Sequence, residues 1–61
     1  MTNEELLALA GRSRVIGAQK RGYTHVEHQR FKSFTTGEDE DTAKFWREAG
    51  PRRVAIKDLL K

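Results

Sequence analysis

The chain has no cysteine and one proline among its 61 residues. Without thiols it can form neither a disulfide nor a thiolate-bound structural zinc site. No apolar run approaches the roughly 20 residues that a membrane-spanning helix needs. The opening Met-Thr-Asn-Glu-Glu is acidic and lacks the basic segment of a signal peptide. These absences predict a cytoplasmic protein that does not contact a membrane.

The residue types and motifs of common catalytic sites are also scarce. The two serines, Ser13 and Ser33, do not lie in a nucleophile-elbow pattern, and no glycine-rich loop is suited to hold a phosphate. The four consecutive acids at 38–41 have no apolar neighbours in the sequence that would prepare a carboxyl group for proton transfer. We therefore predict that the protein is not an enzyme, binds no cofactor and has no small-molecule substrate.

The two histidines raise the question of a metal site. His25 and His28 would share one face of a helix, with Glu27 nearby. A structural zinc ion takes four ligands, and no cysteine or further histidine is present to complete such a set. The prediction is that the protein holds no metal.

The length predicts a single small domain over residues 1–61, because a chain of this size buries only about 60% of its unfolded surface. Its stability must then come from a few large apolar side chains and well-formed helix ends. The candidate core residues are Leu6, Leu7, Leu9, Val15, Ile16, Tyr23, Val26, Phe31, Phe34, Phe45, Trp46, Val54, Ile56, Leu59 and Leu60.

Capping patterns predict the first helix. Thr2 followed by Glu5 is a capping box, and the apolar residues that follow recur at helical spacing. Gly11 either interrupts this helix, leaving a second short helix over 13–21, or lies within a longer one. Gly22 ends the segment in both cases.

The rest of the chain also favours helices. Thr24 and Glu27 form a second capping-box pattern, which predicts a helix over 24–34, with a short strand over 29–35 as the alternative. The acids at 38–41 suit the first turn of a helix that ends before Gly50. Pro51 then begins a last helix, with a strand over 53–56 as the alternative. The predicted fold is mainly α: three to four short helices, possibly with a short strand or hairpin.

Charge is distributed in alternating blocks. The chain carries 12 basic and 9 acidic residues, a net charge of +3. One basic set lies before the acids at 38–41 and another follows them, which predicts docking onto an oppositely charged partner. The predicted partner-binding residues are six basic side chains and the only tryptophan: Arg12, Arg14, Lys20, Arg21, Arg30, Lys32 and Trp46. Arginine and tryptophan are both enriched among residues that dominate interface energies.

The segment TNEELLALAGRSRVIGAQKRG, residues 2–22, resembles the start of a repressor-type helix-turn-helix. The resemblance implies DNA binding through Ser13, Arg14, Gln19, Lys20 and Arg21, with Arg14 or Gln19 on base edges and Lys20 and Arg21 on phosphates. Two positions depart from that pattern. Arg12 replaces an apolar turn residue, and Gly17 replaces a branched residue within the second helix.

The chain as a whole is similar in size, mixed charge and lack of cysteine to small bacteriophage regulators that bind the host RNA polymerase. This resemblance implies a non-enzymatic transcription regulator in the host cytoplasm, with an acidic surface of the polymerase as its partner. A DNA-binding protein and a small structural or assembly protein remain the alternatives.

Overall fold

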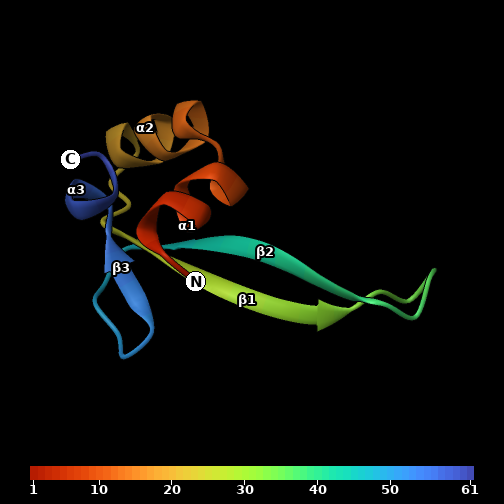
Figure 1. Ribbon diagram of the computed structural model, residues 1–61. Helices are drawn as coiled ribbons and strands as arrows, with labels where there is room; N and C mark the ends of the chain where they lie inside the picture. Colours follow the sequence, from red (N-terminus) through yellow and green to blue (C-terminus); the bar gives the residue numbers. More distant parts are fainter.

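The computed structural model describes residues 1–61 and contains three helices and three strands (Figure 1). In chain order the elements are α1 (Asn3–Ala10), α2 (Arg12–Lys20), β1 (His25–Lys32), β2 (Asp39–Trp46), β3 (Arg53–Ala55) and α3 (Ile56–Leu59). The helices gather at one end of the molecule, and the far half of the β1–β2 hairpin extends away from them. None of the helices has the length and apolar character needed to cross a membrane.

The start of α1 forms as its sequence predicts. The Thr2 hydroxyl accepts a hydrogen bond from the Glu5 backbone N–H at 3.2 Å, and the Glu5 carboxylate accepts one from the Thr2 backbone N–H. Gly11 has a φ of 88°, which side chains other than glycine rarely adopt, and it separates α1 from α2. The open question at Gly11 is therefore settled in favour of two helices.

β1 and β2 form an antiparallel hairpin of eight residue pairs, from His25–Trp46 to Lys32–Asp39. The connection is a tight loop in which the Ser33 N–H donates to the Glu38 carbonyl oxygen at 2.8 Å. β3 pairs with only the first three residues of β1, so the sheet order is β2-β1-β3. Beyond Glu27, β1 has β2 as its only neighbouring strand.

The core lies between the helices and the near end of the sheet. Its seven buried residues are Leu6, Ala10, Val15, Ala18, Val26, Ile56 and Leu59. Each helix contributes two of them, and β1 contributes only Val26. Leu9, Ile16, Phe31 and Phe34, which the sequence placed among the core candidates, are exposed.

The prediction of a mainly α fold is wrong, because a three-stranded sheet replaces two of the expected helices. The segments 24–34 and 38–49 form β1, β2 and their flanking loops. Residues of opposite charge face each other across the hairpin: Arg30 lies opposite Asp41, and Lys32 lies opposite Asp39. Cross-strand pairs of this kind stabilise a hairpin. The acids at 38–41 therefore lie at the start of a strand and do not neutralise a helix dipole.

The C-terminal segment combines the two alternatives. The predicted strand over 53–56 is present as β3, and the helix is confined to the single turn Ile56–Leu59. Ile56 and Leu59 are both buried, so the apolar spacing that suggested a helix marks the residues of α3 that enter the core.

Arg53 fixes the loop between β2 and β3. Its guanidinium donates to the carbonyl oxygens of Glu48 and Ala49 at 3.3 and 3.2 Å and lies 3.6 Å from the Glu27 carboxylate. The Cζ atom is 3.5 Å from the centroid of the Trp46 ring. Only 16% of this side chain is exposed, in contrast to its exposed neighbour Arg52.

Replacing Arg53 should therefore destabilise the fold. We expect Arg53→Ala to lower the free energy of unfolding by about 2 kcal/mol, because it removes a cation–π contact and two hydrogen bonds. Urea denaturation followed by Trp46 fluorescence measures the effect. Arg52→Ala is the matched control and should stay within about 0.5 kcal/mol of the wild type. Equal losses in the two variants would contradict the role assigned to Arg53.

Candidate functional site

The structure separates the predicted partner-binding residues into groups. Arg12, Arg14, Lys20 and Arg21 lie on or directly after α2, are exposed and form no ion pair. Arg30 and Lys32 are on the hairpin, on a strand that faces acidic residues across the ladder. The predicted single basic surface is therefore two surfaces. Every basic residue of the surface on α2 lacks an ion-pair partner, whereas Arg30 on the hairpin has one.

The residues predicted to face DNA are all exposed. Ser13, Arg14 and Lys20 lie within about 120° of one another around α2, and Gln19 lies outside this range. Val15 and Ala18 are buried and define the face of the helix that meets the core. Gln19 is five positions after Arg14, which places the two residues about 140° apart around the helix at 100° per residue. Arg14 and Gln19, the two alternatives for reading base edges, thus lie on opposite sides of the buried face.

Arg14 and Arg21 border a hollow between α2 and the near end of the hairpin, which we call the arginine groove. Its volume is about 400 Å³. The lining residues are Ser13, Arg14, Gly17, Ala18, Arg21, Tyr23 and Phe45. Two arginines without acidic partners thus stand beside a half-buried aromatic wall.

That wall is a packed aromatic pair. The ring centroids of Tyr23 and Phe45 are 5.9 Å apart with the planes tilted by 47°, a favourable arrangement for two aromatic rings. Arg47, directly after β2, places its guanidinium carbon 3.9 Å from the Tyr23 centroid. Arg47, which the sequence prediction did not include, lines an adjoining hollow that shares Tyr23 and Phe45 with the groove. No local pattern indicates Arg47 or Phe45, because hairpin pairing alone brings them to Tyr23.

Trp46 lies on the opposite face of the sheet from Phe45, since adjacent strand residues point to opposite faces. Its ring is in contact with two cations, Lys44 Nζ at 4.4 Å and Arg53 Cζ at 3.5 Å from the centroid. Its indole N–H is buried and has no hydrogen-bond acceptor. The structure therefore places Trp46 away from the arginine groove, in contacts that hold the β2–β3 loop.

The two histidines are not brought together. They are three residues apart on β1 and so point to opposite faces of the sheet. No group of three or more histidine or acidic side chains is positioned to hold a metal ion. His28 Nε2 is instead 2.8 Å from the Asp41 carboxylate, and Arg30 Nε is 3.2 Å from the same oxygen.

These contacts set the electrostatics of the hairpin. An ionised carboxylate only accepts hydrogen bonds, so His28 must donate through Nε2–H. The hydrogen bond from His28, followed by that from Arg30, lowers the pKa of Asp41 below its ordinary value of 3.8. Asp41 is therefore an anion whose Oδ1 atom is engaged by the basic strand.

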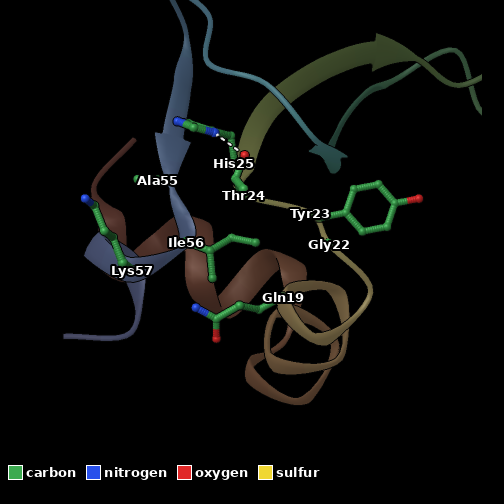
Figure 2. A pocket seen from close by; sticks show the side chains of 8 residues that line it. All are labelled: Gln19, Gly22, Tyr23, Thr24, His25, Ala55, Ile56 and Lys57. Atoms are coloured by element: carbon green, nitrogen blue, oxygen red, sulfur yellow. Dashed lines mark hydrogen bonds between the residues drawn. The ribbon is translucent and has the colours of Figure 1, made fainter.

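A second hollow of about 380 Å³ lies between the end of α2 and β3 (Figure 2). Gln19 and Ile56 border it, and the Tyr23 ring points away from both. Among the residues that line it, the arrangement most similar to a nucleophile and its base is Thr24 and His25. The Thr24 Oγ1 atom is 2.7 Å from His25 Nδ1. No acidic side chain contacts His25 to orient it, as a nucleophile–base pair requires, so the geometry gives no basis for assigning catalysis here.

Unpaired charge collects at the two ends of the molecule. The far half of the hairpin, residues 29–42, carries two basic and four acidic residues, and the rest of the chain carries ten basic and five acidic residues. Glu38, Asp39 and Glu40 form no ion pair. Phe34 in the loop beside them is fully exposed. The helical end is thus basic, and the hairpin end is acidic with an aromatic side chain at its tip.

Comparisons with protein families, with curated proteins and with solved structures gave no match to this chain.

Asp41 makes the hairpin sensitive to acid. Because its pKa is lowered in the folded state, its stabilising contribution is present above pH 3.8 and is lost as the pH falls through the lower folded value. We expect amide chemical shifts and hydrogen exchange of residues 28–41 to report loosening of the hairpin in that range. Asp41→Asn should abolish this pH dependence. Asp39→Asn, which removes an acid without an ion pair, should preserve it, and loss in both variants would contradict the assignment.

Proposed function

We propose that the protein is a non-enzymatic regulator that binds an acidic surface of the transcription machinery, with RNA polymerase as the first candidate, through the arginine groove. The observation that carries the binding role is the position of Arg14 and Arg21 beside the Tyr23–Phe45 pair, with Arg47 stacked on Tyr23 from an adjoining hollow. The choice of polymerase is supported by the resemblance of the whole chain to small phage regulators, and not by any feature of the groove.

The groove combines the two features that protein interfaces use for affinity. Arginine binds carboxylates through a planar fork of donors, and the half-buried rings supply apolar area beside it. None of the three arginines has a carboxylate partner within the chain. A partner that places an aspartate or glutamate beside an apolar side chain would satisfy both features at once.

The same geometry favours a protein over duplex DNA as the partner. A recognition helix needs a row of exposed side chains that enter the major groove together. In α2, Arg14 and Gln19 lie on opposite sides of the buried residues Val15 and Ala18, so only one of the two can belong to such a row. The unpaired acids of the hairpin also add repulsion toward a phosphate backbone that lies along the molecule.

The test is binding of purified protein to bacterial RNA polymerase without nucleic acid. Arg14→Glu/Arg21→Glu should weaken this binding at least about tenfold, because it reverses two charges beside the apolar wall. Arg12→Glu/Lys20→Glu changes the net charge of α2 equally and leaves the groove intact. We expect this control to lose less than about threefold in affinity. Circular dichroism establishes that both variants fold.

Other outcomes would contradict the proposal in different ways. Equal losses in the two variants would mean that only net charge matters. Absence of polymerase binding would remove polymerase as the partner. Binding to DNA alone, with a steep dependence on salt, would favour the DNA-binding alternative.

A further inference from the structure

The hairpin tip has the chemistry that the arginine groove would bind. Phe34 is fully exposed, and Glu38, which flanks the same loop, carries no ion pair. The backbone of the loop is fixed by the hydrogen bonds from Ser33 to Glu38 and from Gly37 to Ser33, both shorter than 3 Å. Because the backbone of this loop is already fixed, a contact through its aromatic side chain and carboxylates does not require the loop to become ordered on binding.

The tip cannot reach the groove of its own chain. Val26 pairs with Phe45 at the near end of the hairpin, and Ser33 is seven positions further along the chain. At about 3.3 Å per strand residue, the loop begins roughly 23 Å from the groove. The hairpin also runs away from the helices (Figure 1). A hairpin tip that enters the groove must therefore belong to another molecule.

We propose that the tip of one molecule docks in the arginine groove of a second copy, with Phe34 against Tyr23 and Phe45 and the acids near Arg14 and Arg21. This inference rests on the binding role proposed for the groove, and it names the occupant of the groove when no other partner is present. Aromatic packing and opposite charges coincide at both surfaces, which is the complementarity that a specific contact requires.

A twofold axis allows both copies to make the contact at once. Two hairpins side by side in opposite directions place each tip near the groove of the other molecule, because the distance from tip to groove is the same in both. Such a reciprocal exchange closes the assembly as a dimer, whereas a single contact repeated in one direction would produce an open chain. The dimer masks the arginine groove, so self-association would compete with an acidic partner.

Sedimentation of the purified chain provides the first test. We expect the mass to rise from 7.0 kDa towards twice that value between concentrations of roughly 10 µM and 1 mM, as for a small interface. Phe34→Ser and Arg14→Glu/Arg21→Glu should each raise the dissociation constant at least about tenfold. Thr35→Ala at the tip and Arg12→Glu/Lys20→Glu on α2 are the matched controls. A wild-type protein that stays monomeric at 1 mM would overturn the proposal.

Mixing the two defective variants distinguishes specific docking of the tip in the groove from non-specific association. Isotope-labelled Phe34→Ser retains its groove, and unlabelled Arg14→Glu/Arg21→Glu retains its tip. Addition of the second to the first should shift the amide resonances of Gly17, Tyr23 and Phe45. Addition of unlabelled Phe34→Ser should leave them in place, and equal shifts in both mixtures would refute the contact. Because no polymerase is present, failure here is distinguishable from failure of the proposed regulatory function.

Discussion

The structure depends on the pairing of β1 with two neighbours at its first three residues. Val26 at the centre of this stretch is fully buried and pairs with Phe45 on one side and Val54 on the other. The helices pack onto this near end of the sheet, since every other buried residue belongs to α1, α2 or α3. A chain of this size has only enough apolar surface to cover one end of its hairpin.

The uncovered far half of the hairpin must therefore be held by its own contacts. Asp41 accepts hydrogen bonds from His28 and Arg30, and the loop is closed by backbone hydrogen bonds. These contacts leave three acids without ion-pair partners at the hairpin end, and the arginines of α2 are without such partners at the helical end. The proposals for a partner and for self-association both follow from this separation of charge.

The arginines of this protein have two roles, one in binding and one in holding the fold together. Arg53 is largely buried, stacks on Trp46 and bonds two carbonyl groups, so its guanidinium is committed to the fold. Arg47 stacks on Tyr23 but forms no ion pair, and Arg14 and Arg21 contact no acid. Burial and neighbours therefore decide which arginines are structural and which are free to bind, and neither property can be read from residue type.

The sequence by itself determined the local features of the helical end. The Thr2–Glu5 capping box, the break that Gly11 allows and the apolar spacing of Ile56 and Leu59 all depend on residues within one turn of each other. Only the tertiary structure decided the hairpin. The capping pattern at Thr24 and the acids at 38–41 suit a helix equally well in the sequence, and the pairing of β1 with β2 selects the strands. The same pairing brought Phe45 beside α2 and Arg47 onto Tyr23, and it divided the predicted basic residues between two surfaces. Long-range contacts of this kind do not appear in a local sequence pattern. The charged residues could therefore be identified from the sequence, but their placement at two opposite ends of the molecule could not.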